Sequence, residues 1–307
     1  MGWLRVIAVA TLLATSTPAL ANTFEEAVAL YDDKNYNAAF EIVRTLAEKG
    51  NKDAQAMLAS LYETGRGTER NMSQAVNWYA AAATQDHLGS MFALGMIYLD
   101  GTSGTRDPER AREWTERAAN AGHVPAQHNL ALIFAGAGGA EPDWQRAVTW
   151  FRKAASKGFA DSEYNLGILY LEGRGVDKDI TLAGEWFKKA ALKGLPAAAM
   201  DYGVLVFRGE GVRKDEKIGA QWLLYAANAG NAIAQNRVAR LYANGRGVEK
   251  NGIEAVKWHL IATKSGRTDA WLDSFAERLG ESQREEAVKR AEKFRPAAPK
   301  VVLPKTN

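Results

Sequence analysis

The sequence contains no cysteine among its 307 residues. A disulfide framework, a thiolate metal site, a cysteine nucleophile and a lipidated N-terminal cysteine are therefore all excluded. Histidine is scarce, with four residues, and the formal net charge is only +3. For a chain of this length that charge is too small to indicate a nucleic-acid partner or an anionic membrane.

Long apolar runs are missing after the N-terminus, so no later segment is expected to span a membrane. The first 21 residues, MGWLRVIAVATLLATSTPALA, have the features of a secretory signal. Arg5 gives a positive charge, Val6 to Ala14 form an apolar stretch, and Ala19 and Ala21 form an A-x-A cleavage site. Nine apolar residues are too few for a bilayer span, which needs about 20. We predict a signal peptide over residues 1–21 and a periplasmic or secreted protein that begins at Asn22.

An internal repeat of 36 residues runs without gaps from Lys52 to Arg267 and gives six units. One tryptophan recurs in every unit: Trp78, Trp114, Trp150, Trp186, Trp222 and Trp258. An alanine recurs four positions later: Ala82, Ala118, Ala154, Ala190, Ala226 and Ala262. Because large and small residues in a fixed register suit packing between helices, we expect these columns to form the core.

Each unit also carries a glycine-rich stretch, such as GRGVDKD at 173–179. A phosphate-binding loop would be needed once and would end in Gly-Lys-Ser/Thr, whereas this stretch recurs six times without that ending. Its glycines suit a helix end with positive φ. The residue that closes it is always a favoured helix N-cap: Asn71, Asp107, Asp143, Asp179, Asp215 or Asn251. The stretch therefore predicts a turn between two helices.

The pattern predicts two antiparallel helices in each unit. In the fourth unit we expect helices at about 161–172 and 180–193, with Leu166, Leu169 and Tyr170 on the buried side of the first. Gly167 would allow close approach of the next helix. The predicted class is all-α, an α/α solenoid of about six 36-residue helix-turn-helix repeats with terminal capping helix pairs.

The ends deviate from the repeat, as the ends of a solenoid do. We expect an N-terminal capping helix pair within 22–51, the six repeats over 52–267, and C-terminal capping helices over 268–295 with Ser282 as a helix cap. The proline-rich residues 296–307 are expected to form a disordered tail.

The motif LGILYLEGRGVDKDITLAGEWFKKAALKG resembles the Sel1-like repeat (SLR), a branch of the tetratricopeptide superfamily. The resemblance implies a right-handed α-superhelix and an adaptor that holds peptide segments or partner domains, in exported bacterial members often at the cell envelope. Two departures are the sequence GAGGAEPD in the third repeat and Val206 at an otherwise aromatic position. A cysteine-rich exported branch is associated with β-lactam binding or hydrolysis, but this chain lacks those cysteines.

The sequence offers little for catalysis. It contains no G-x-S-x-G, H-E-x-x-H or complete S-x-x-K motif set. His87 and His123 share a repeat column and are expected to be about 10 Å apart, which is too far for one metal ion. His123 could approach His128, but two imidazoles without a third ligand are weak grounds for a metal site. We therefore predict no enzyme activity, no cofactor and no metal.

A binding surface is the stronger hypothesis. If the first helix of each repeat lines the concave side, one strip of its side chains faces a groove. The strip begins with apolar or small residues, namely Met57, Ser60, Ala93 and Met96. It continues with Asn129, Leu132, Asn165 and Ile168 and then becomes charged, and its edge holds Phe92, His128 and Tyr164. Its predicted partner-binding residues are Asn129, Tyr164, Asn165, Asp201, Arg208, Arg237 and Arg240.

The chemistry of the strip suits a peptide. Asparagine can hydrogen-bond the backbone of an extended peptide, and arginine can hold a carboxylate or phosphate with two hydrogen bonds. Together with the predicted signal peptide, the strip favours an exported protein with a protein or peptide partner. The resemblance implies an adaptor whose function is connected with envelope signalling or assembly. A hydrolase acting on cell-wall or β-lactam substrates and a peptidoglycan- or glycan-binding protein remain as alternatives.

Overall fold

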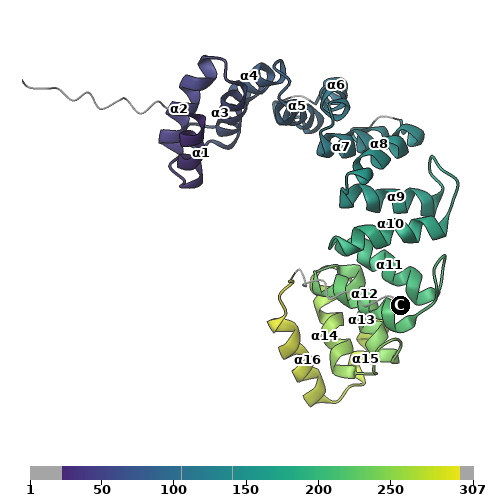
Figure 1. Ribbon diagram of the computed structural model, residues 1–307. Coiled ribbons are helices and arrows are strands. Elements are labelled where there is room, and N and C mark those ends of the chain that lie inside the picture. Colours follow the sequence, from purple (N-terminus) through teal and green to yellow (C-terminus); the bar gives the residue numbers. More distant parts are fainter. Residues whose placement is uncertain (1–22, 105, 140, 298–307) are drawn as a thin grey trace, which may run out of the picture. The chain divides into compact units, whose positions relative to one another are not determined.

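The computed structural model describes residues 23–104, 106–139 and 141–297. Sixteen α-helices and no β-strand occur in these residues, so the predicted all-α repeat class is confirmed (Figure 1). The chain divides into two compact units, the first holding α1 to α4 and most of α5, the second holding α6 to α16. The predicted signal peptide lies outside the described residues.

The helices of the first unit are α1 (Phe24–Asp32), α2 (Tyr36–Glu48), α3 (Lys52–Thr64), α4 (Met72–Ala83) and α5 (Leu88–Asp100). Those of the second unit are α6 (Pro108–Asn120), α7 (Val124–Phe134), α8 (Trp144–Ser156), α9 (Ala160–Glu172), α10 (Ile180–Leu192), α11 (Pro196–Arg208), α12 (Glu216–Asn228), α13 (Ala232–Asn244), α14 (Gly252–Lys264), α15 (Ala270–Glu277) and α16 (Glu281–Lys293). Within each repeat the odd-numbered helix comes first.

Helices that follow one another in the sequence pack against one another in the structure. In the second unit each helix from α6 to α14 packs against the next, and α14 also contacts both α15 and α16. In the first unit α1, α2, α3 and α4 pack in the same successive way. This local order is typical of a solenoid, in which each repeat contacts only its neighbours. As a result, the first helices of successive repeats place equivalent side chains side by side.

The glycine stretch is a helix-to-helix turn in every repeat. In the fourth, Gly173 ends α9 with φ +74° and Asp179 caps α10 by accepting a hydrogen bond of 2.9 Å from the Leu182 amide. All six predicted N-cap residues accept such a bond. The cap's own amide donates back to the preceding helix, as from Asp179 to the Tyr170 carbonyl at 2.9 Å.

That backbone bond survives the two departures from the repeat pattern. In the third repeat α7 ends at Phe134 and its C-cap, Ala135, has a negative φ of −79°, yet the Asp143 amide still donates to the Phe134 carbonyl at 2.7 Å. In the fifth repeat the Asp215 amide donates to Val206 at 2.9 Å. The turn therefore does not depend on the aromatic side chain.

The second glycine of the turn reaches back to an earlier repeat. A Cβ at Gly175 would lie 2.5 Å from the carbonyl of Trp144, the first residue of α8. Gly211 has the same relation to Ile180 at the start of α10, and Gly247 to Glu216 at the start of α12. Only glycine leaves room for this contact, so in the fourth, fifth and sixth repeats the turn also joins one repeat to the preceding one.

The recurring alanines are all buried in the core, whereas only some of the recurring tryptophans are. Every one of these alanines is fully buried. Trp150, Trp222 and Trp258 are buried, with 8%, 1% and 2% of their surface exposed. The other three tryptophans, Trp78, Trp114 and Trp186, are only half-buried, although two of them, Trp78 and Trp186, still pack against the hydrophobic core. Cations pack over some of these rings, as Arg117 does over Trp114 at 4.5 Å.

Gly167 has the predicted packing role, since a Cβ there would lie 2.5 Å from the Phe187 ring of α10. At the C-terminal end the predicted cap Ser282 was wrong. Gly280 occupies the N-cap position of α16 and provides no side-chain hydrogen bond. Ala297, within the predicted tail, donates its amide to the Asn228 carbonyl at 3.1 Å, and residues 298–307 of that tail lie outside the described residues.

Candidate functional site

The predicted strip lies on the first helices of the repeats, and we call it the first-helix strip. Its first-unit residues Met57 and Ser60 are half-buried, as are Asn129, Asn165 and Ile168 of the second unit. Arg208 and Arg240 are exposed. These side chains are therefore partly accessible, and Asn165 directs its amide to the Asp161 carbonyl of its own helix at 2.8 Å.

Three strip residues on successive first helices interact with one another. The Tyr164 hydroxyl of α9 donates to the Asp201 carboxylate of α11 at 3.0 Å. Burial and the Asp201 charge raise the pKa of Tyr164, so it stays protonated as a donor. Burial raises the pKa of Asp201, while the Tyr164 hydrogen bond and the Arg237 charge lower it. These contacts fix the orientation of the strip where α9, α11 and α13 meet.

Arg237 of α13 is a partly buried cation of the strip with an unsatisfied hydrogen-bond donor. Its Nε is buried and has no hydrogen-bond partner among the described residues. Burial, followed by the like charge of Arg208, lowers the pKa of Arg237, whereas Asp201 raises it. A buried donor without a partner costs free energy, so an anion at this position would be stabilising.

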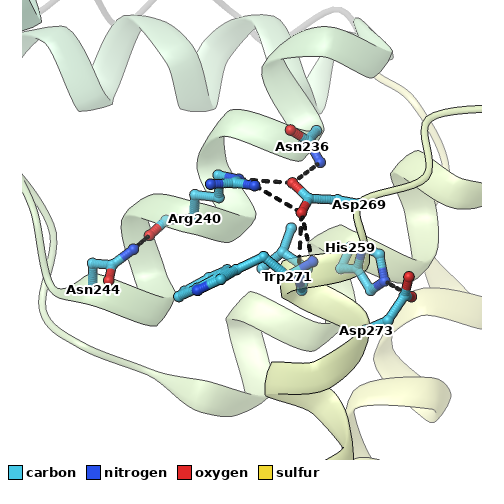
Figure 2. A network of polar contacts seen from close by, with 8 residues as sticks. Asn236, Arg240, Asn244, His259, Asp269, Trp271 and Asp273 are labelled. Atoms are coloured by element: carbon cyan, nitrogen blue, oxygen red, sulfur yellow. Dashed lines mark hydrogen bonds and ion pairs between the residues drawn. The ribbon is translucent and has the colours of Figure 1, made fainter.

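Arg240 has a different role from the one predicted. It holds Asp269 with two hydrogen bonds, from Nε at 2.7 Å and from a terminal nitrogen at 2.8 Å (Figure 2). The Asn236 amide adds a third at 3.0 Å. Asp269 is the N-cap of α15, and the Arg240 guanidinium also packs over the Trp271 ring at 5.2 Å. Arg240 therefore binds a carboxylate as predicted, but one of its own chain.

This network predicts a pH dependence of stability. The Arg240 hydrogen bond, more than any other contact, lowers the pKa of Asp269 from its ordinary value of 3.8 to about 2. A lowered carboxyl pKa stabilises the fold above the unfolded value and loses that contribution as pH falls toward the folded one. We expect Asp269→Asn to cost about 2 kcal/mol of unfolding free energy at pH 7.

Chemical unfolding of the parent and of Asp269→Asn between pH 7 and pH 2 would measure this contribution. The difference between the two proteins should be constant down to about pH 4 and shrink below it. A constant difference down to pH 2 would show that the loss arises from something other than the charge. Asp273→Asn is the control, since Asp273 lies in α15, the helix that Asp269 caps, and pairs instead with His259 of α14 at 2.7 Å.

A pocket of about 400 Å³ lies beside the strip, bounded by α11, α12, α13 and the loops that follow α11 and α13. We call it the arginine pocket. Its wall contains five cationic side chains and no carboxylate: Arg208, Lys214, Arg237, Arg240 and Arg246. The remaining wall is apolar and consists of Val204, Phe207, Leu223 and Leu241.

The sequence predicted three of these cations and missed two. Arg208, Arg237 and Arg240 were placed on the strip, and the structure brings them to one pocket. Lys214 and Arg246 belong to glycine-rich turns, which sequence reasoning treated as connections only. The Arg246 guanidinium lies 4.8 Å from the centre of the Phe207 ring, so the turn contributes to the pocket wall.

The histidines have structural partners. His87 and His123 are N-caps of α5 and α7, each accepting a backbone hydrogen bond through Nδ1. His128 contacts the Ser162 hydroxyl at 2.8 Å, and burial lowers its pKa. No group of three potential metal ligands occurs within residues 23–104, 106–139 and 141–297. The same residues contain no helix of the length and apolar character that a bilayer crossing requires.

Comparison with protein families gives a direct match. The model of the Sel1 repeat matches six consecutive segments, 52–87, 89–123, 124–159, 160–195, 196–231 and 232–266. These segments coincide with the 36-residue period seen in the sequence. No curated protein matches the chain at a significant level.

Two solved structures are similar over most of this chain. A protective antigen present in uropathogenic Escherichia coli strains, which displays an SLR fold, has 28% identity and a TM-score of 0.78. The match covers 90% of this chain and 62% of that protein, so the chain spans under two thirds of its length. A Sel1 repeat protein from Oxalobacter formigenes has 28% identity and a TM-score of 0.69, covering 79% of this chain and 96% of that one.

Proposed function

Because this chain belongs to the Sel1 repeat family, whose members generally mediate protein–protein interaction, we propose that it is an adaptor that binds a protein partner on its first-helix strip. The proposed adaptor is non-enzymatic, in keeping with a repeat family that is typically non-catalytic. It is exported, a proposal that rests on the N-terminal sequence with its A-x-A site.

The observation that carries the proposal is the juxtaposition of equivalent first-helix side chains from successive repeats. Tyr164, Asp201 and Arg237 interact across α9, α11 and α13, next to a pocket rich in cations. An extended segment of a partner would cross these helices one after another and meet a polar residue on each. Recognition of this kind uses a few anchors on a shaped surface.

Crosslinking capture from intact cells tests the adaptor. We expect the parent protein to recover one envelope protein and Asn165→Arg to reduce that recovery by about tenfold or more, because an unpaired charge within an interface is costly. Gln221→Arg is the matched control. It makes the same amide-to-guanidinium change on the exposed side of α12, a second helix, and should leave recovery unchanged.

Equal recovery with both variants would place the partner elsewhere on the protein, and recovery of no protein with the parent would contradict the adaptor proposal. The same experiment tests export, because the N-terminal residue of the adaptor itself can be determined after it is purified from the cells. Asn22 is expected, whereas a chain that still begins at Met1 would contradict cleavage at the predicted site.

A further inference from the structure

We propose that the arginine pocket binds a single carboxylate attached to an apolar group, as an acidic side chain beside an apolar residue in the partner's segment would provide. The inference rests on the proposed function, and it specifies the chemistry of one residue pair through which the partner would be held. It comes from three observations: the charge of the wall, the unsatisfied donor in it, and its apolar side.

The net charge of the pocket wall remains positive when the carboxylates that pair with its cations are counted. Glu216 is shared by Arg246 at 2.5 Å and Lys214 at 3.3 Å. Asp269 pairs with Arg240, and Glu210 lies 3.5 Å from Arg208. With Asp201 near Arg237, four carboxylates face the five cations of the wall.

This charge distribution favours a monoanion. The excess is one positive charge, so a carboxylate balances it. A phosphate group carries about −1.5 to −2 charges at neutral pH and would leave a net negative charge near Glu216 and Glu210. The carboxylate is therefore the ligand group that the pocket fits best.

Arg237 is the residue with which the carboxylate would pair. Its buried Nε has no partner, and the pocket brings it together with Arg208, whose like charge is unfavourable to it. A carboxylate between the two guanidinium groups would accept a hydrogen bond from each and screen their repulsion. The Arg208 side chain is exposed, so its guanidinium is accessible to a ligand in the pocket.

The apolar side of the pocket favours a ligand that carries an apolar group as well as the anion. Val204, Phe207, Leu223 and Leu241 line one side of the pocket, and Arg246 packs on the Phe207 ring. A volume of about 400 Å³ lies within the usual range for small-molecule sites. It is large enough for an acidic side chain together with an apolar neighbour, whereas a small inorganic anion would leave the apolar wall uncovered.

Calorimetric titration of the full protein with the peptide acetyl-Leu-Asp-Leu-amide tests the proposal. We expect it to bind about tenfold or more tightly than acetyl-Leu-Asn-Leu-amide, its neutral counterpart, because hydrogen bonds to charged groups are stronger. Arg237→Gln and the exposed Arg208→Gln should each remove this preference. Arg213→Gln, the same substitution in the exposed loop after α11 and outside the wall, should keep it.

Equal binding of the two peptides, or a preference that survives both wall substitutions, would overturn the proposal. Tighter binding of inorganic phosphate than of the aspartate peptide would overturn the choice of a carboxylate. If the peptides fail to bind while Asn165→Arg still abolishes partner capture, the pocket inference fails and the adaptor stands. If the peptide preference holds and no partner is captured, the adaptor fails and the pocket assignment stands.

Discussion

Replacing Trp222 with alanine is expected to lower the free energy of unfolding of the second unit by about 3–5 kcal/mol. Only 1% of the Trp222 surface is exposed, and the ring meets Tyr202 edge-on with 5.5 Å between ring centres. It therefore joins α12 to the first helix of the same repeat. Its removal leaves a cavity that the rigid backbones of the stack cannot close.

Urea unfolding followed by circular dichroism would measure the loss, and hydrogen exchange would locate it to α11, α12 and α13. Trp114→Ala provides the comparison, because Trp114 occupies the same repeat position but is half-buried. A markedly smaller loss is expected there. Equal losses at the two positions would contradict the finding that burial in the tryptophan column is uneven.

Gly247→Ala is expected to lower the free energy of unfolding by about 2–5 kcal/mol, the sum of two separate costs. Gly247 has φ +68°, and a Cβ there would overlap the carbonyl oxygen of Glu216. The left-handed conformation costs a residue other than glycine about 1–2 kcal/mol. Displacement of the start of α12 adds about 1–3 kcal/mol, the usual range for overpacking.

Gly245→Ala separates these two effects. Gly245 has nearly the same φ, +69°, but the atom nearest to a Cβ there would be the Lys250 Cβ at 3.1 Å, and the closest backbone atom would be the Lys250 nitrogen at 3.5 Å. We expect it to show the conformational cost alone when thermal or chemical unfolding of the two variants is compared. If Gly245→Ala were as destabilising as Gly247→Ala, the contact with Glu216 would not be the reason for glycine at this position.

The local features of the fold could be predicted from the sequence because they depend on neighbouring residues. The N-cap at Asp179 and the left-handed glycine at Gly173 follow from residue types within one turn. The burial of Ala190 follows from its place in the repeat. The uneven burial of Trp186 and Trp222 does not, because it depends on which side chains the adjacent repeats place against each ring.

In the candidate site, too, the features that depend on the repeat could be predicted and those that depend on distant contacts could not. The sequence placed Arg208, Arg237 and Arg240 on one strip, and they line one pocket. It did not pair Arg240 with Asp269, because Asp269 caps a helix that departs from the 36-residue register. Arg246 was missed because a glycine-rich turn was expected only to connect helices. Both residues act through contacts distant in sequence.

The contact between Gly247 and the start of α12 also bears on how such a chain can change length in evolution. In the fourth, fifth and sixth repeats the turn fits the second helix of the preceding repeat only when glycine faces its first carbonyl. A shift by one residue would bring Arg246 or Val248 to that place. A gene encoding this stack therefore gains or loses segments as whole periods, by duplication or deletion of complete modules.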